Sequence, residues 1–257
     1  MSGTEPTTQP TPDEGATPLA LSIVLPVYCE ERVLERTFAE LTPCLEGLGR
    51  SFEIICVDDG STDGSLEILR SIAARDPRVR VDALPQNRGK GAAVRAGMLQ
   101  ARGEYAVFMD ADLSTPLEEI PGLLGALDSG YEVVLGNRRA PGSHIERQQP
   151  LIRQYLGRGF TFITQFFLAP GVQDFTCGFK AFRRDAARRI FERSSLDGWA
   201  FDAELVVIAA AQRCKLVQVP VRWRHEDDTK VRLIDAVLGS GRDLFVIAWK
   251  RVRGDYA

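Results

Sequence analysis

The chain has 257 residues, of which 44% are hydrophobic and 26% are charged, and its formal net charge is −3. This length suits one large domain, and the composition is ordinary for a globular protein. The small negative charge gives no global basic surface, so nucleic acid is not an expected partner. Five scattered cysteines without a CxxC pair and only two histidines disfavour structural zinc and fit a reducing compartment, so we expect a cytoplasmic protein.

Residues 1–18 are rich in Pro and Thr and nearly free of large apolar side chains. Such a stretch cannot bury enough surface to offset its ordering entropy, so we expect a disordered tail, and it lacks the apolar stretch of a signal peptide. No later stretch reaches the roughly 18 uninterrupted apolar residues of a transmembrane helix. Any association with a membrane is therefore expected to be peripheral, or supplied by a partner.

From Leu19 onward, short β-branched runs alternate with helical patterns. This alternation predicts an α/β fold with a mostly parallel sheet flanked by helices. The predicted strands of the first half cover 20–28, 51–59, 78–84, 104–112 and 131–138. The predicted helices between them cover 30–48, about 63–74, 89–101 and 115–127.

The pattern changes after Arg138. In chain order we expect a polar loop at 140–150, an amphipathic aromatic-rich helix at 151–168, a strand or extended loop at 174–182, a helix at 202–212, a strand at 215–225 and a long helix with a basic end at 232–253. No linker separates the two halves, so one domain over 19–257 is expected.

Polar and acidic clusters follow three predicted strands, at 26–30, 58–61 and 110–112. Ligands of open α/β sheets bind outside the carboxyl ends of the strands, so the three clusters are expected to form one acidic pocket. The sharpest signal is the pair Asp110 and Asp112, which follows a buried run. Two carboxylates at this spacing suit a hard divalent cation. The competing interpretation is a strand-end turn with two solvated aspartates, which also explains this pair when it is considered by itself.

Two further turns suit a nucleotide. Asp58 and Asp59 precede Gly60 in a turn where a carboxylate can accept hydrogen bonds from a base or ribose, beyond the helix capping that Asp63 supplies. The turn at 87–91, with Lys90 at a helix start, offers positive charge and backbone N–H groups to phosphate, although a plain helix entry explains it about as well.

The order of these motifs resembles that of family 2 glycosyltransferases with the GT-A fold. The segments that carry the resemblance are SIVLPVYCEE, VDDGSTDGS, NRGKGAAVRAGMLQARGEY and FMDADLSTP. Downstream, DFTCGFKAFRRDAA, WAFDAELV and the stretch from VPVRW to DDTKV are similar to the polyprenyl-phosphate branch, especially dolichyl-phosphate glucosyltransferases. The resemblance extends from Leu21 to about Trp249.

The resemblance implies one GT-A domain in which residues 19–137 bind the nucleotide and residues 138–257 bind the acceptor. It implies that base and ribose contact Pro26, Tyr28, Glu30 and Asp59, that Asp58 supports this loop, that Lys90 belongs to the nucleotide-sugar site, and that Asp110 and Asp112 hold Mg²⁺ or Mn²⁺ against the diphosphate. Mannose-transferring relatives commonly carry Gln where Ser114 stands here, which favours a glucosyl donor and leaves a third protein ligand of the metal in doubt.

The implied reaction is an inverting displacement at the anomeric carbon of a hexose from UDP-glucose, with a polyprenyl or dolichyl phosphate as acceptor. Such a phosphate is already a nucleophile at neutral pH and needs cations to hold it. The candidates are Arg138, Lys180, Arg222, Arg224 and Lys230, although Arg222 and Arg224 serve equally well as surface charges. Asp202 and Glu204, near a predicted helix start, are expected to line the donor sugar, to favour the helix N-terminus or to pair with an Arg, and Asp202 is the candidate base if the acceptor is a hydroxyl.

A lipid acceptor requires a membrane surface, and the aromatic-rich helices at 151–168 and 232–253 are candidates to lie in it, at the inner face of the membrane. The competing interpretation is that their apolar side chains complete the core. Three alternatives stay open: GDP-mannose as donor, a soluble hydroxyl acceptor, and a non-catalytic nucleotide-sugar-binding module. A nucleotidyltransferase is disfavoured because no glycine-rich basic loop follows the first strand.

Overall fold

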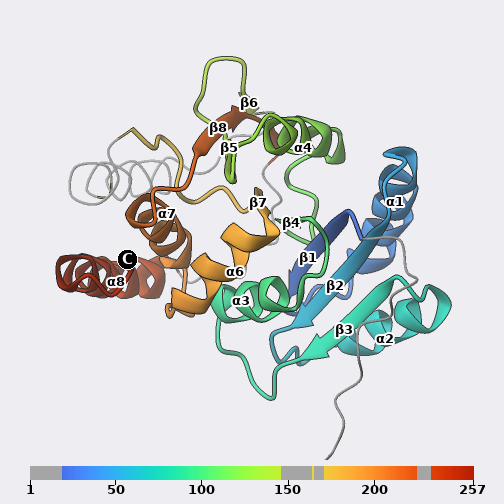
Figure 1. The fold of residues 1–257 in the computed structure, drawn as a ribbon. Coiled ribbons are helices and arrows are strands. Elements are labelled where there is room, and N and C mark those ends of the chain that lie inside the picture. The colour runs from blue at the N-terminus through green and yellow to red at the C-terminus, as the bar shows by residue number, and fades with distance from the viewer. Residues whose placement is uncertain (1–18, 146–163, 165–170, 225–232) are drawn as a thin grey trace, which may run out of the picture.

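The computed structural model describes residues 19–145, 164, 171–224 and 233–257. Its centre is a seven-stranded sheet in the order β3-β2-β1-β4-β7-β5-β8 (Figure 1). The strands are β1 (Leu21–Val27), β2 (Phe52–Asp58), β3 (Val79–Ala83), β4 (Tyr105–Phe108), β5 (Val133–Asn137), β7 (Lys180–Arg183) and β8 (Leu216–Pro220), and β6 (His144–Ile145) pairs separately with β9 (Arg222–Trp223).

The helices that the structure describes alternate with these strands along the chain. They are α1 (Leu34–Gly47), α2 (Ser65–Arg75), α3 (Lys90–Gln100), the 3₁₀ turn η1 (Leu117–Glu119), α4 (Ile120–Asp128), α6 (Arg184–Arg193), α7 (Phe201–Ala211) and α8 (Leu233–Arg253). The predicted α/β class and the mostly parallel sheet are confirmed.

The sheet has a core on both faces because its central strands are apolar on both sides. Ile23 of β1 belongs to the core beneath α1, α2 and α4, whereas its neighbour Val24 belongs to the core beneath α3, α6 and α7. The second core includes an aromatic cluster in which Phe108 lies 6.1 Å, centroid to centroid, from Phe182. Successive strand residues thus attach the sheet to both helical layers.

One strand runs against the others. β7 is antiparallel to β4 and β5, with Phe108 opposite Lys180 and Leu135 also opposite Lys180. The remaining neighbours pair in parallel, so β1, β2 and β4 end at the same edge of the sheet. Strands β7 and β8 come from the second half of the sequence, and they share the sheet with the strands of the first half.

The structure differs from the sequence-based expectations in two elements, and two other expected segments lie outside the described residues. Helix α6 was not expected, because its exposed arginines conceal the short apolar stripe formed by Ala187, Ile190 and Phe191. The strand expected at 215–225 is divided at Val221 into β8 and β9. The helix expected at 151–168 lies outside the described residues apart from Thr164, and so does the tail at 1–18.

Helix α8 lies beside α7 at one end of the molecule (Figure 1). Ile247 is buried in the core on this side of the sheet, and Leu244 and Ala248 pack against the same core. On the same helix, Phe245, Trp249 and Val252 are exposed. None of the helices within the described part of the chain is long and apolar enough to cross a bilayer.

Candidate active site

The loops that follow β1 and β2 are joined by hydrogen bonds at the carboxyl edge of the sheet. The Asp59 amide donates to the Val27 carbonyl at 2.8 Å, and the Cys29 amide donates to Ser61 Oγ at 2.8 Å. The Glu30 amide donates to Ser65 Oγ at 2.7 Å. This bonding places Pro26, Tyr28 and Glu30 beside the Asp58–Asp59 turn, with Tyr28 38% exposed.

Asp59 organises the turn before α3. Its carboxylate accepts hydrogen bonds from the amides of Arg88 and Gly89, each at 2.8 Å, and from Asn87 Nδ2 at 3.0 Å. Burial raises the pKa of Asp59 although these bonds stabilise its charge. The adjacent Asp58 is 1% exposed, and its Oδ1 has no hydrogen-bond partner among the described residues.

The two carboxylates of the expected metal pair lie immediately after β4. Asp112 Oδ1 accepts a hydrogen bond from the Ser114 amide at 2.8 Å. Leu113, which lies between Asp112 and Ser114, has a left-handed φ of 58°. Burial raises the pKa of the Asp112 carboxyl, and the negative charge of Asp110 raises it further. The ammonium of Lys90 forms an ion pair with Asp110.

This pair suits a hard divalent cation. Burial and, to a smaller extent, the negative charge of Asp110 raise the pKa of Asp112, and a cation shared by the two carboxylates would offset both effects. Among the described residues there is no group of three or more His, Cys, Asp or Glu side chains arranged for a metal. Within the described residues, Asp110 and Asp112 would supply two carboxylates to such a cation, and diphosphate oxygens and water would fill other positions.

The segment before β7 packs against the acid pair. A Cβ atom added to Gly178 would lie 2.7 Å from Lys90 Nζ and would also overlap the carboxylate of Asp110. An added Cβ would therefore force the ends of the Lys90 and Asp110 side chains to shift.

Lys180, at the start of β7, does not face an acceptor phosphate as the sequence analysis predicted. Its side chain is fully buried, and its ammonium donates to the carbonyls of Phe175 at 3.0 Å and Cys177 at 2.6 Å and pairs with Asp202. An ammonium enclosed in this way is out of reach of an acceptor phosphate, which corrects the predicted role of Lys180. Asp202 is 3% exposed, and burial raises its pKa against the lowering effect of Lys180.

Arg138 follows β5 and keeps an accessible edge. Its guanidinium binds Asp174 in a two-pronged ion pair, with Nε–Oδ2 at 2.7 Å and Nη2–Oδ1 at 2.8 Å, and also donates to Thr176 Oγ1 at 2.9 Å. It lies over the Trp223 ring at 5.4 Å. Asp174 is wholly buried, and although burial opposes it, Arg138 lowers the pKa of Asp174 to about 2.

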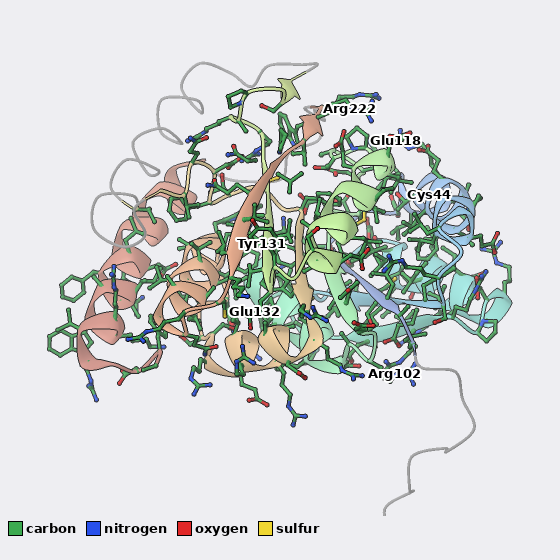
Figure 2. All side chains as sticks on the ribbon, turned by 45° about the horizontal axis from the view of Figure 1, so that its top comes forward. Cys44, Arg102, Glu118, Tyr131, Glu132 and Arg222 are labelled. Carbon is green, nitrogen blue, oxygen red and sulfur yellow. The ribbon has the colours of Figure 1, made fainter. Side chains whose placement is uncertain are left out.

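The remaining predicted cations are dispersed. Arg222 pairs with Glu119 at 2.6 Å and Glu118 at 3.4 Å, near the start of α4 (Figure 2). The Arg224 amide donates to the Ser114 carbonyl at 2.8 Å, which ties this residue to the loop after the acid pair. Lys230 lies outside the described residues.

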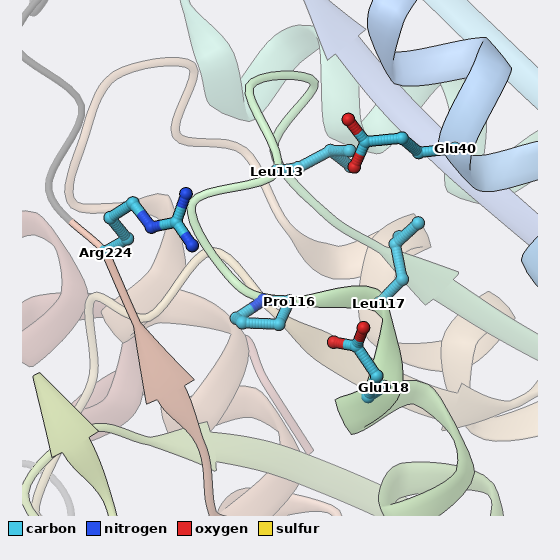
Figure 3. A pocket seen from close by; sticks show the side chains of 6 residues that line it. All are labelled: Glu40, Leu113, Pro116, Leu117, Glu118 and Arg224. Carbon is cyan, nitrogen blue, oxygen red and sulfur yellow. The ribbon is translucent and has the colours of Figure 1, made fainter. Parts of the chain in front are cut away.

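Arg224 also lines a cavity of about 160 Å³ on the outer side of this loop (Figure 3). The other lining residues are Glu40, Leu113, Pro116, Leu117 and Glu118. Neither Asp110 nor Asp112 lines this cavity, although Leu113, next to Asp112, does.

The sequence of this chain matches a known protein family. The family model "Glycosyl transferase family 2" matches residues 22–191. The chain belongs to glycosyl transferase family 2. It is therefore a glycosyltransferase, and the expected family membership is confirmed.

Relatives within this family lie in the predicted branch. The chain is 35% identical to a dolichyl-phosphate beta-glucosyltransferase of Trichomonas vaginalis over 238 residues, covering 88% of this chain and 70% of the relative. It is also 35% identical to the dolichyl-phosphate beta-glucosyltransferase of Drosophila melanogaster over 257 residues, covering 93% of this chain and 77% of that protein.

The solved structures support the GT-A fold of this family member. One is glucosyl-3-phosphoglycerate synthase from Mycobacterium tuberculosis with Mn²⁺, UDP-glucose and phosphoglyceric acid, with a TM-score of 0.68 and 22% identity over 90% of this chain and 80% of that one. The same enzyme with UDP has a TM-score of 0.67 and 23% identity, with the same coverage. At this identity the likeness shows the fold alone.

The structure also reveals site residues that sequence analysis of this transferase missed. Asp197 accepts hydrogen bonds from Arg88 and Arg95, and its carbonyl accepts one from the Gly91 amide at 2.8 Å. Trp199, 47% exposed, lies over Lys90 with Nζ 5.8 Å from the ring centroid. Asp197 belongs to no periodic pattern, and Trp199 opens the segment WAFDAELV, whose resemblance assigned no role to it.

Glu204 does not lie at the donor sugar, the position that sequence analysis suggested for it. It is fully buried and accepts hydrogen bonds from the amides of Ser195 at 2.8 Å and Leu196 at 2.9 Å, and from the Tyr256 hydroxyl at 2.8 Å. Glu204 therefore holds the loop before α7 rather than lining a sugar.

Proposed function

We propose that this transferase moves glucose from UDP-glucose to a dolichyl or related polyprenyl phosphate, with Mg²⁺ or Mn²⁺ at Asp110 and Asp112. The observation that carries the proposal is the acid pair after β4, beside the joined loops of β1 and β2. The names of the relatives support the choice of donor sugar and lipid phosphate.

The nucleotide half of the site consists of the loop residues. The exposed Tyr28 ring and the adjacent Pro26 suit the flat base, while Glu30, beside the Asp58–Asp59 turn, suits base and ribose N–H and O–H groups. Asp58 Oδ1 has no hydrogen-bond partner among the described residues, whereas both oxygens of Asp59 bind the turn at 87–89. Asp58 and Asp59 are 1% and 3% exposed, so within this site they support the loop, and the accessible contacts for base and ribose are Tyr28 and Glu30.

When bound, the cation supplies Lewis-acid stabilisation of the departing diphosphate. Asp110 and Asp112 hold and orient it, and Lys90 adds positive charge at the start of α3. The acceptor phosphate needs no proton removed, so its attack depends on position and on charge neutralisation.

Arg138 is the cation best placed to hold that phosphate. Asp174 and Thr176 fix its orientation, and 16% of its side chain is accessible. Arg224 is a second candidate because its backbone is bonded to the loop that follows Asp112. Arg222, 45% exposed and paired with Glu118 and Glu119, is at most a peripheral contact.

The state of Asp202 favours a phosphate over a hydroxyl acceptor. A base for a hydroxyl must reach the proton that it removes. Asp202 is 3% exposed, and its Oδ1 is paired with the buried ammonium of Lys180. This carboxylate stabilises the loop before β7 and is poorly available as a base.

Helix α8 supports a peripheral position on the inner face of the membrane, where a lipid acceptor is presented. Phe245, Trp249 and Val252 are 71%, 56% and 86% exposed, and their spacing places them on one side of the helix. Exposed Arg251 and Arg253 flank them. Aromatic and basic side chains on one helix suit the interface of an anionic bilayer.

The test is incubation of the purified protein and Mn²⁺ with UDP-glucose, GDP-mannose or other nucleotide sugars, together with polyprenyl phosphate. Glucose should appear on the lipid from UDP-glucose and only when the divalent cation is present. Transfer from GDP-mannose, or transfer to a soluble sugar while the lipid stays unlabelled, would overturn the assignment of donor or acceptor.

A further inference from the structure

The ammonium of Lys90 lies in a compartment built around it. It pairs with Asp110, the absent side chain of Gly178 leaves room for it, and the Trp199 ring covers it at 5.8 Å. Only 17% of the Lys90 side chain is exposed, against 34% for Asp110. This enclosure distinguishes Lys90 from a solvated lysine at a helix start.

The backbone beneath Lys90 is fixed, so only its side chain is free to move. Gly89 has φ 112°, and its amide donates to Asp59, while the Gly91 amide donates to the Asp197 carbonyl. A Cβ atom added to Gly89 would lie 2.5 Å from that same carbonyl. The turn therefore presents the lysine at one place relative to the acid pair.

The surrounding charges make this ammonium an internal counter-ion. The ion pair with Asp110 places this ammonium on one member of the acid pair. Lys90 donates to Oδ1 of Asp110, and a divalent cation bound to the same carboxylate would lie close to this ammonium, so the two cations would repel each other. Lys90 and the metal thus compete for Asp110.

We infer that Lys90 neutralises the acid pair in the donor-free enzyme and is transferred to the diphosphate when donor and metal bind. This inference rests on the metal site of the proposed function. It makes nucleotide and metal binding cooperative, because the diphosphate supplies the anion that draws Lys90 away from Asp110. Without nucleotide, the divalent cation must displace Lys90 unaided and binds weakly.

The test measures Mn²⁺ binding by electron paramagnetic resonance, without substrate turnover. Lys90→Met removes the competitor, so the variant should bind Mn²⁺ alone at least tenfold more tightly than the wild type. With Mn²⁺ saturating, the same variant should bind UDP at least tenfold more weakly, because the diphosphate loses its cation. A gain in Mn²⁺ affinity together with a loss in UDP affinity distinguishes exchange from general damage to the fold, which would weaken the binding of both ligands.

Three further variants complete the design. Lys90→Arg keeps the charge and should bind Mn²⁺ alone as the wild type does, and Lys90→Gln should repeat the methionine result if Lys90→Met folds poorly. Lys215→Met is the matched control, because Lys215 is exposed at the amino end of β8, the edge opposite the site. It should change neither affinity.

The outcomes separate the two proposals. If wild-type protein binds no Mn²⁺ even with UDP, the metal site of the proposed function fails. If the wild type binds Mn²⁺ with UDP, yet Lys90→Met and Lys90→Gln bind Mn²⁺ alone no more tightly than the wild type, the exchange is refuted while the metal site stands.

Discussion

At the scale of single residues, most charged groups near this site lie in pairs or clusters. Lys90 holds Asp110, Lys180 holds Asp202, and Arg138 holds Asp174. Burying an ion is costly unless a partner or a ligand neutralises it, so each pair is also a structural element. Burial and the charge of Asp110 raise the pKa of Asp112, so a bound cation would stabilise its charged form.

Replacement of this residue tests the metal assignment. Asp112→Asn keeps the shape of the side chain but removes the charge that a divalent cation requires. Glucose transfer should fall by about a hundredfold or more, while the thermal unfolding temperature should fall little or rise, because mutual repulsion with Asp110 is lost. Asp255→Asn, at an exposed position near the end of the chain, is the control. Near-normal transfer by Asp112→Asn would refute the metal role.

The Arg138–Asp174 pair predicts how stability depends on pH. The folded pKa of Asp174 is about 2, below its ordinary value of 3.8. A carboxyl group whose pKa is lower in the folded than in the unfolded state stabilises the fold at pH values above the unfolded pKa. This contribution, about 2 kcal/mol, is lost as pH falls from about 4 to about 2.

Urea unfolding of wild type and Asp174→Asn measures this contribution. The variant should be less stable at neutral pH, and the gap between the two proteins should narrow as pH falls from about 4 to about 2. A gap that stays constant over this interval would show that Asp174 does not titrate as its pairing with Arg138 requires.

At the scale of elements, the turn before α3 is held by two segments that are distant in the sequence, and by the conformation of its own glycine. Asp59 binds its amides, Asp197 binds its arginines, and Gly89 takes a φ that L side chains rarely adopt. The helix start is therefore fixed by tertiary contacts, since no side chain caps α3.

A pair of glycine substitutions tests this dependence. Gly89→Ala should lower the free energy of unfolding by about 1–3 kcal/mol or more, because its φ is unfavourable and its Cβ would collide with the Asp197 carbonyl. Gly125→Ala, inside α4 with no atom within 4 Å of its Cβ, should raise it by about 0.5–1 kcal/mol. Equal effects in urea denaturation would contradict the role of the turn.

At the scale of the whole molecule, the exposed aromatic side of α8 and the site are parts of one connected structure. Tyr256 and Lys250, at the end of the chain, contact Glu204, and Glu204 holds the loop that carries Trp199 toward Lys90. A surface suited to lipid is thus attached to the same layer of the fold as the site.

The membrane proposal makes a prediction at this scale. Phe245→Ser combined with Trp249→Ser should reduce binding to vesicles of anionic phospholipid by about tenfold or more, since each aromatic side chain contributes roughly 1.5–3 kcal/mol when buried. Transfer to a short-chain, water-soluble polyprenyl phosphate should be retained. Leu99→Ser, at an exposed position on α3, is the control. Unchanged vesicle binding by the double variant would exclude α8 as the docking surface.

By itself, the sequence determined the α/β class, the strand ends and the acid pair. Those features depend on local alternation and on polar residues that directly follow apolar runs, as Asp110 follows Phe108 and Met109. The order of the motifs likewise identified the family, which the comparison confirms.

Only the tertiary structure decided where the long charged side chains lie. Lys180 turns inward because Asp202 and two carbonyls receive it, Lys90 reaches Asp110, and Glu204 holds a loop rather than a ligand. The antiparallel direction of β7 was also beyond sequence analysis. The physical reason is that a flexible cation takes the carboxylate that folding brings nearest, and partners separated along the chain leave no periodic signal.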